Sequence, residues 1–215
     1  MNDFRLNLGC GANLLVGYLN VDKFGNPDLK FDLETFPYPW EDNSVAEIRM
    51  HHVLEHLGQQ TEVYLKIIQE LYRICKAGAK IYITVPHHRS DRFFHDPTHV
   101  RPITPVGLSM FSKRLNNEWK ARGKAFTLLA LYLNVDFELM DVSYTPSEVW
   151  YERYPNNASD TELLLKESEI YCNLIKVFLF TQPHFHVQTT YRKPRRPVHE
   201  LPRKSNGSNQ HHRLV

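Results

Sequence analysis

The chain has 215 residues, of which 42% are hydrophobic and 12% aromatic, and its formal net charge is +2. This composition supports a complete hydrophobic core and excludes a disordered chain, and the length fits one domain. No run of about 18 apolar residues occurs, and no secretion leader precedes the first apolar segment, so we expect no membrane contact and a cytoplasmic location. The three widely spaced cysteines fit reduced thiols.

Short apolar segments, several of which end at Gly, Asp or Pro, and segments in which apolar and polar residues alternate predict β-strands. Seven strands are expected, over Phe4–Leu8, Tyr18–Val21, Leu29–Phe31, Val45–Met50, Lys80–Val85, Phe137–Ser143 and Phe185–Tyr191. Helical spacing predicts helices over Val53–Leu57, Glu62–Lys76, Thr104–Lys113 and Thr161–Phe180, with Gly78 ending the second and Thr104 capping the third. This order predicts an α/β fold with a doubly wound, mostly parallel, seven-stranded sheet and an antiparallel edge strand.

The first predicted strand ends at a Gly-x-Gly turn, Gly9-Cys10-Gly11, and Asp22 follows the second. In α/β folds this arrangement lets the backbone approach a nucleoside and offers a carboxylate to ribose hydroxyls. A dinucleotide site also needs a full helix after the glycines, to hold the pyrophosphate, and an acidic residue about 20 residues on. Only 11 residues separate Gly11 from Asp22. The sequence therefore disfavours NAD and FAD and favours a nucleoside without phosphates.

Five segments, in this order and spacing, resemble class I S-adenosylmethionine (SAM)-dependent methyltransferases, in particular the small bacterial and phage type-11-like members. They are Leu6–Gly11, Leu19–Asp22, Asp32–Leu33, Asp42–Val45 and His52–Leu57. The resemblance implies a Rossmann-like fold with a shortened first helix, and SAM as the cofactor.

The resemblance also implies a role for individual residues. Asp22 is expected to bind the ribose, and Asp32 with Leu33 to contact the adenine. The other expected cofactor contacts lie on the turn and at the end of the fourth strand, at Asn7, Gly9, Cys10, Gly11, Met50 and His51. Many relatives carry Asp where Asn7 stands. Each Asp taken alone would equally fit a turn cap after a strand.

Histidines cluster after the fourth and fifth predicted strands, where ligands bind in open α/β sheets. The segment 94–102 is the expected substrate wall. Methyl transfer needs alignment and, for a hydroxyl or amine acceptor, a base near neutral pKa. We expect His95 or His99 to be that base, Asp96 to orient an imidazole and Arg101 to bind an anionic group, so that Asp96 and Arg101 contact the substrate. An exposed polar loop is the alternative for each histidine.

A metal site is a second reading of the same region. His52, Glu55 and His56 have the spacing of one helix face and resemble the Glu-x-x-Glu-His pattern of some metal-dependent methyltransferases, with His52 in place of the first Glu. His95 or His99 would complete a set that suits Zn²⁺ or a related ion. The same stretch occurs in metal-free relatives, where it packs the helix. The sequence therefore assigns no metal ligand, and the alternative stays open.

The C-terminal end differs in composition from the rest. Residues 192–215 hold seven of the 26 Lys and Arg residues and one of the 24 acidic residues, and they lack apolar periodicity. We expect a methyltransferase domain over residues 1–191 and a basic, disordered tail over 192–215. Nucleic acid is a conceivable partner of this tail but is not favoured. The oligomeric state is left open.

The sequence-based hypothesis is a SAM-dependent methyltransferase that acts on a hydroxyl or amine of a small molecule or sugar. Two alternatives remain. One is a catalytically silent, methyltransferase-like binding protein that uses the basic tail as an adaptor. The other is a metal-assisted O-methyltransferase.

Overall fold

The computed structural model describes residues 4–148, 152 and 172–182, and these belong to a compact unit of residues 1–184. The predicted strand Phe185–Tyr191, the basic tail and the domain boundary at residue 191 lie outside the described residues. Within the described residues, no helix has the length and apolar character needed to span a bilayer.

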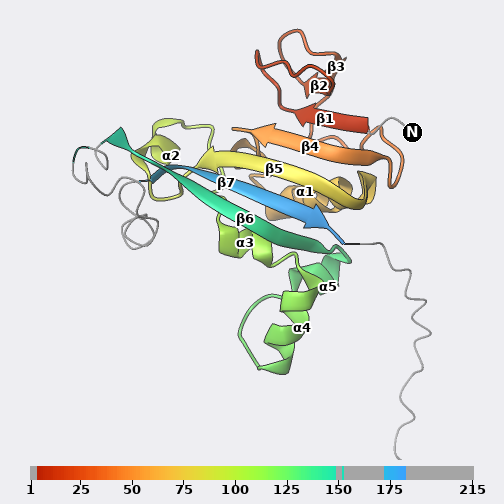
Figure 1. Cartoon of the computed structure of the whole chain (residues 1–215), viewed down its shortest axis with the longest axis vertical. Helices are drawn as coiled ribbons and strands as arrows, with labels where there is room; N and C mark the ends of the chain where they lie inside the picture. The colour runs from red at the N-terminus through yellow and green to blue at the C-terminus, as the bar shows by residue number, and fades with distance from the viewer. Residues whose placement is uncertain (1–3, 149–151, 153–171, 183–215) are drawn as a thin grey trace, which may run out of the picture. The chain divides into compact units, whose positions relative to one another are not determined.

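Seven strands form one sheet in the order β3-β2-β1-β4-β5-β7-β6 (Figure 1). Their bounds are β1 Phe4–Leu8, β2 Leu19–Asp22, β3 Leu29–Lys30, β4 Val45–His51, β5 Cys75–Pro86, β6 Phe137–Pro146 and β7 Cys172–Thr181. The first five pair in parallel, and β7 is antiparallel to both β5 and β6. The predicted α/β class with a mostly parallel seven-stranded sheet is confirmed, and the antiparallel strand stands one position in from the edge.

The connection from β1 to β2 forms turns without a helix, consistent with the short span predicted between the glycines and Asp22. Two buried amides hold this loop. Asn7 Nδ2 donates to Asn13 O at 2.8 Å and to Asn20 Oδ1 at 2.9 Å, and Leu15 N donates to the same Asn20 oxygen at 2.8 Å. These bonds satisfy loop backbone groups that a helix would otherwise pair.

The predicted helix Thr161–Phe180 is wrong over its second half, where the structure has strand β7; residues 161–171 lie outside the described residues. Val177 and Leu179 are buried towards the helices, whereas Phe178 and Phe180 alternate with them on the other face. Because both faces of this segment are apolar, the alternation of a strand is hidden in its sequence. Pairing with β5 on one side and β6 on the other fixes the extended conformation.

The helix after β4 is α1, Thr61–Ile74, and it packs its apolar side on the sheet. The prediction that Gly78 ends this helix is wrong, because α1 stops at Ile74 and Gly78 (φ +79°) lies within β5. The segment Val53–Leu57 contains one 3₁₀ turn, η1 Leu54–His56, rather than an α-helix.

Four short helices lie between β5 and β6: α2 Asp91–His95, α3 Pro105–Ser109, α4 Lys113–Ala121 and α5 Leu129–Leu133. Thr104 caps α3 as predicted, since its hydroxyl accepts from Gly107 N at 3.0 Å, but the helix ends at Ser109. The ring contact of Tyr64 with Phe111 places α1 beside the connection between α3 and α4, and the contact of Tyr72 with Phe137 of β6 shows that α1 covers this face of the sheet.

Figure 1 looks onto the opposite face, where no described helix lies in front of β4, β5 and β7. A row of planar side chains crosses these strands. The guanidinium of Arg49 lies 4.4 Å from the centre of the Tyr82 ring, which stacks on Phe178 at 5.0 Å. Stacking within this row shields part of its apolar surface from water.

Candidate functional site

Ligands of open α/β sheets bind at the carboxyl ends of the parallel strands, and the glycine turn stands at that end of β1. Gly9 has φ +65°, and a Cβ added there would lie 2.4 Å from Cγ2 of Val53. The backbone of β1 therefore passes directly against the segment that follows β4. Only glycine satisfies both the left-handed conformation and this close approach.

Asp22, the last residue of β2, has its carboxylate fixed by backbone groups. Oδ2 accepts from Gly11 N at 2.8 Å, and Oδ1 accepts from Phe24 N at 2.9 Å. Each oxygen keeps a second lone pair that a ligand hydroxyl can use. Asp22 thus ties the glycine turn to the end of β2 and still offers acceptors.

Asp32 stands just beyond β3. Its Oδ2 pairs with Lys23 Nζ at 3.6 Å, and its Oδ1 accepts from Glu34 N at 3.0 Å. The neighbouring ring of Phe31 is held edge-on by Tyr38 and Trp40. The ends of β2 and β3 therefore present carboxylates beside a rigid apolar surface.

These groups line one cavity of about 380 Å³, the size of a small-ligand pocket. Four of the residues predicted for the cofactor lie there: Gly9, Asp22, Asp32 and Leu33. Sequence reasoning did not assign the other lining residues to this cavity: Lys23, Phe24, Phe31, His52, Val53, His56, Leu57 and Thr98. Lys23 and Phe24 directly follow Asp22, so adjacency was a usable signal for them. Thr98 carries no such signal.

The remaining predicted cofactor residues do not line this cavity. Asn7 and Met50 are buried in the fold, and Cys10 is 5% exposed. Burial, followed by the charge of Asp22, raises the pKa of the Cys10 thiol, which keeps it protonated. His51 is exposed at the end of β4, and Gly11 serves the site through its N–H to Asp22.

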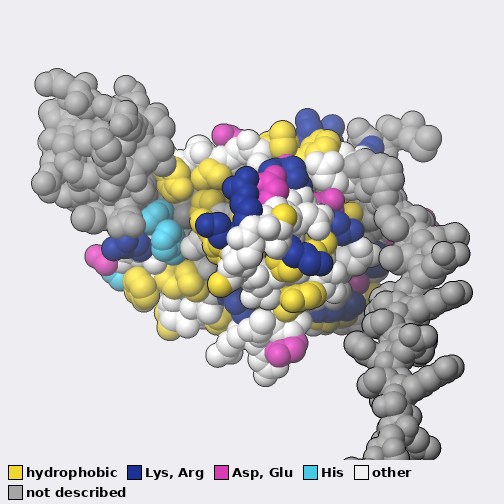
Figure 2. Space-filling model, turned by 90° about the horizontal axis from the view of Figure 1, so that it is seen from below, with side chains coloured by type: hydrophobic (Ala, Val, Ile, Leu, Met, Phe, Trp, Pro, Cys, Tyr) yellow, Lys and Arg dark blue, Asp and Glu magenta, His cyan; other side chains and the backbone are white. Residues whose placement is uncertain are grey.

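A second cavity, of about 550 Å³, adjoins the first at His52, which lines both. Its other walls come from the segment after β5 and include His95, Asp96 and His99. His52 has φ +56°, a strained conformation for a histidine, which turns the chain sharply between β4 and η1. Figure 2 shows histidine side chains gathered at one end of the face that it views.

The segment after β5 is fastened to η1 through backbone bonds. Val100 N and Arg101 N both donate to Glu55 O, at 2.9 Å and 3.2 Å. The side chain of Arg101 turns away from both cavities: it donates to Gly58 O at 2.8 Å and stacks 4.3 Å from the centre of the Tyr64 ring. The anion-binding role expected for Arg101 finds no support in this position.

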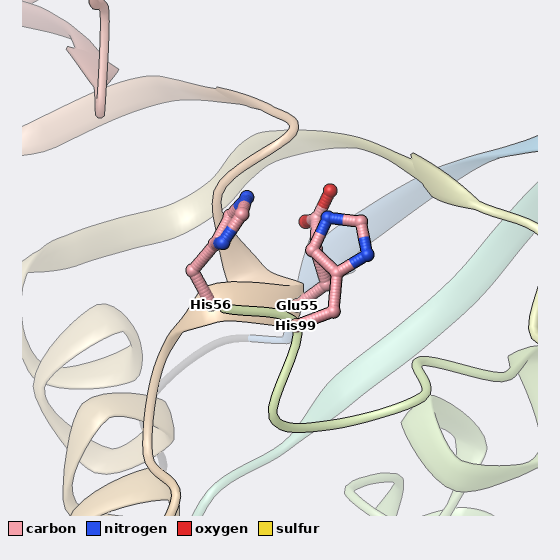
Figure 3. A group of neighbouring side chains, drawn as sticks. All are labelled: Glu55, His56 and His99. Carbon is pink, nitrogen blue, oxygen red and sulfur yellow. The ribbon is translucent and has the colours of Figure 1, made fainter. Parts of the chain in front are cut away.

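The same fastening brings Glu55, His56 and His99 together, with one ligand-type atom of each within 4.8 Å of the others (Figure 3). His52 joins them through Nδ1, which lies 3.2 Å from Glu55 Oε1. The sequence grouped His52, Glu55 and His56 by their spacing. It could not choose between His95 and His99 as a neighbour, and the structure places His99 there.

No protein-family model and no curated protein sequence matches the chain. Solved structures do match. A SAM-dependent methyltransferase from Archaeoglobus fulgidus is 16% identical, with a TM-score of 0.55 over 83% of this chain and 86% of its own. SAM-dependent methyltransferases from Methanosarcina mazei (13% identical, TM-score 0.49, 85% and 94% covered) and Mesorhizobium loti (13%, 0.45, 83% and 91%) also match. At these identities, the likeness to the first of them establishes a shared fold.

Proposed function

We propose that this chain, which has the fold of class I SAM-dependent methyltransferases, transfers a methyl group from SAM to a hydroxyl or amine of a small molecule or sugar. The observation that carries the proposal is the first cavity, where the close backbone turn at Gly9 meets Asp22 and Asp32 at the ends of three adjacent strands. This arrangement suits a nucleoside whose ribose lies against Asp22 and whose base lies against Phe31 and Leu33.

The loop also explains why the nucleoside would carry no phosphate. Pyrophosphate binds to free backbone N–H groups at a helix N-terminus. Here Gly9 N and Cys10 N donate to Val21 O, Gly11 N donates to Asp22, and Asn13 N donates to Cys10 O. With those donors occupied and no helix after the turn, the loop offers no cradle for a phosphate, whereas SAM needs none.

The reaction needs little chemistry from the protein, because the sulfonium of SAM is already a strong electrophile. A lone pair on the acceptor oxygen or nitrogen attacks the methyl carbon. The carbon–sulfur bond breaks and its electron pair returns to sulfur, which becomes the neutral thioether of S-adenosylhomocysteine. The acceptor loses one proton to a base.

The second cavity supplies groups for that acceptor. His95 is exposed there on α2, and His99 and Asp96 lie on the loop that follows. Hydrogen bonds from the Thr98 hydroxyl and backbone lower the pKa of Asp96, so its carboxylate is charged and can orient a hydroxyl or an imidazole. We assign the role of base to His95 or His99, and that of acceptor contact to Asp96.

Calorimetric titration of the full chain with SAM and with S-adenosylhomocysteine tests the proposal. We expect one site for each ligand. Asp22→Asn and Asp22→Ala should weaken binding about tenfold or more, because a charged acceptor of two ribose hydroxyls is lost. Asp141→Asn removes an exposed carboxylate on β6 that lines neither cavity and should leave binding unchanged.

The circular dichroism spectrum of each variant shows whether it is folded. A folded wild-type protein that gives no heat with either ligand would overturn the proposal. So would equal weakening by Asp141→Asn and Asp22→Asn.

A further inference from the structure

Glu55 is a carboxylate without exposure to water. It is 0% exposed, and its Oε2 atom has no hydrogen-bond partner among the described residues. Its other oxygen, Oε1, faces His52 Nδ1 at 3.2 Å, and the His52 side chain is 37% exposed. A buried carboxylate oxygen without a donor is unfavourable unless a positive charge reaches it. A cation bound next to Glu55 Oε2 would therefore compensate the charge of this buried carboxylate.

The tautomer of His56 is set by its neighbours. Thr98 Oγ1 donates its proton to Asp96 Oδ1 at 2.6 Å, so the hydroxyl oxygen is left to accept from His56 Nδ1 at 2.9 Å. A neutral imidazole that donates through Nδ1 carries its lone pair on Nε2. Asp96 and Thr98 thus prepare the far nitrogen of His56 as a ligand atom.

His99 is prepared in the same way by a different partner. Its Nδ1 lies 2.7 Å from Phe93 O, and a carbonyl oxygen can only accept, so this nitrogen must carry the proton. The lone pair of neutral His99 is again on Nε2. A backbone carbonyl that accepts from the second ring nitrogen is one of the groups that fix the orientation of metal-binding histidines in proteins. The side chain of His99 is 7% exposed, so the packing also holds the ring in place.

We propose that Glu55, His56 and His99 bind one divalent transition-metal ion, with Zn²⁺ as the best match. Their ligand-type atoms lie within 4.8 Å of one another, so small rotations of the side chains bring all three to one ion (Figure 3). Two imidazole nitrogens and one carboxylate oxygen form a donor set that suits Zn²⁺. Three protein ligands leave a further coordination position, as in catalytic rather than structural zinc sites.

The open position would serve the acceptor, and this part of the inference rests on the proposed function. His56 lines the first cavity and His99 lines the second, so the ion stands in the wall between them. An acceptor hydroxyl bound to the ion becomes more acidic and is held at a fixed place beside the cofactor. Since His99 is then a ligand, His95 is the imidazole left to take the acceptor proton.

The test is a metal titration of the full chain after chelation and removal of the chelator. Co²⁺ is the reporting ion, because its visible absorption changes with coordination, and Zn²⁺ is then added in competition. We expect one tight Co²⁺ site that Zn²⁺ displaces. Glu55→Gln, His56→Asn and His99→Asn should each abolish the visible band or weaken the affinity by about a hundredfold or more.

Thr98→Val tests the supporting contact rather than a ligand. It removes the hydroxyl that fixes His56 Nδ1, and we expect about a tenfold to hundredfold loss of affinity. Thr84→Val, on the half-buried surface of β5, is the matched control and should leave the affinity unchanged. His95→Asn and His51→Asn remove nearby imidazoles outside the cluster and should also bind the metal as the wild type does.

Two results would overturn the metal site: a folded wild-type chain that binds neither ion, or an affinity that survives in His56→Asn and His99→Asn while His51→Asn or His95→Asn loses it. Titration with S-adenosylhomocysteine, run on the same samples, separates this outcome from failure of the proposed function. If the protein binds S-adenosylhomocysteine but no metal ion, the metal site is refuted and the proposed function is not.

Discussion

Two independent constraints act on Gly9, the residue that directly follows β1. Its φ of +65° is costly for any residue with a Cβ, and a Cβ there would also lie within 2.4 Å of Val53. Gly11 shares the first constraint, with φ +51°, but has nothing within 4 Å of its Cβ position. A comparison of alanine substitutions at Gly9 and Gly11 therefore separates the cost of backbone strain from the cost of the steric contact.

We predict that Gly9→Ala lowers the free energy of unfolding by about 3 kcal/mol, and Gly11→Ala by about 1–2 kcal/mol. The difference is the steric contact with Val53. In a Val53→Ala background, the cost of Gly9→Ala should fall towards that of Gly11→Ala, because the contacts at 2.4 and 2.7 Å with the Val53 methyl groups are removed and only the contact with its Cβ at 3.1 Å remains. Urea denaturation of the four variants measures this cycle, and equal costs for Gly9→Ala in both backgrounds would contradict the explanation.

For single residues, the sequence predicted which end of the sheet a residue lies at more reliably than it predicted which way its side chain points. Asp22 and Asp32 follow strands that run in parallel, so their meeting at one end of the sheet was predictable, and both line the first cavity. Asn7 and Met50 were grouped with them by resemblance, yet the pleat turns both into the fold, where Asn7 braces the loop. A shift of one residue along a strand changes the face that a side chain occupies.

Among the elements, α1 is joined to the loop before β4 through two of its charged side chains, Glu70 and Arg73, which also pair with each other within the helix. Glu70, with 4% of its side chain exposed, pairs with Arg73 at 2.7 Å and accepts from Tyr38 N at 2.7 Å. Arg73 in turn donates to Tyr38 O, Trp40 O and Asp42. Two prolines keep this loop out of regular structure, and these bonds satisfy its backbone instead.

We predict that Arg73→Met lowers the free energy of unfolding by about 3 kcal/mol at pH 7, because it removes the nearer of the two cations that face the buried Glu70 carboxylate and leaves only Lys66 Nζ, 3.7 Å away. Arg114→Met, which breaks a pair with Glu118 and Glu138 in which the Arg114 side chain is 56% exposed, should cost less than about 1 kcal/mol. Urea denaturation measures both. Similar losses in the two variants would contradict a special role for Glu70.

The same pair predicts a dependence on pH. Burial by itself raises the pKa of Glu70, but the hydrogen bonds from Arg73 and from Tyr38 N, with the charges of Arg73 and Lys66, outweigh it and lower the pKa below its usual value of 4.5. Its contribution to stability is therefore complete above pH 4.5 and is lost as the pH falls through the folded-state pKa. The stability gap between the wild type and Glu70→Gln should shrink below pH 4.5, whereas exposed Glu62→Gln should show no such trend.

Helices and strands whose apolar residues repeat with a clear period were predictable. Elements whose conformation is decided by pairing with distant strands were not. The first four strands were expected close to where they lie, because each is a short apolar segment, whereas β5 begins at Cys75, five residues before the predicted start at Lys80. In β7, Val177 and Leu179 face the helices, but Phe178 and Phe180 make the opposite face equally apolar. Such a segment is compatible with a buried helix, and only its pairing with β5 and β6 decides the outcome.

In the molecule as a whole, β7 is anchored to the beginning of β5 by a single hydroxyl. Thr181, which is 0% exposed, donates to Lys76 O at 2.7 Å and accepts from Ala79 N at 3.0 Å. These bonds join segments about 100 residues apart in the chain.

We predict that Thr181→Val lowers the free energy of unfolding by about 2 kcal/mol, because the buried Ala79 N–H loses its acceptor while the volume is conserved. Thr181→Ser keeps the hydroxyl and should recover part of that loss, limited by the missing methyl group. Thr84→Val serves as the control. Thermal or urea unfolding provides the measurement, and a neutral Thr181→Val would show that the anchor does not contribute.

The large-scale arrangement was predictable where it follows from chain order and unpredictable where it joins distant segments. The ends of β1, β2 and β3 were expected to meet because parallel strands share one end of a sheet. The meeting of Glu55 with His99 depends on backbone bonds from residues 100 and 101 to Glu55 O. No local pattern in the sequence encodes such a bond.

The position of β7 has a consequence for how the protein is made. Every residue that lines the first cavity lies between residues 9 and 98, whereas the strand that covers the outer edge of β5 begins at residue 172. On a translating ribosome the ligand-binding half therefore emerges first, and the edge of β5, with Ile81, Ile83 and Val85, waits unpaired. Bare edges of this kind recruit other chains. A nascent or truncated chain that stops short of residue 172 therefore has all the residues of the first cavity but leaves the edge of β5 unpaired and prone to aggregation. Synthesis of β7 pairs this edge.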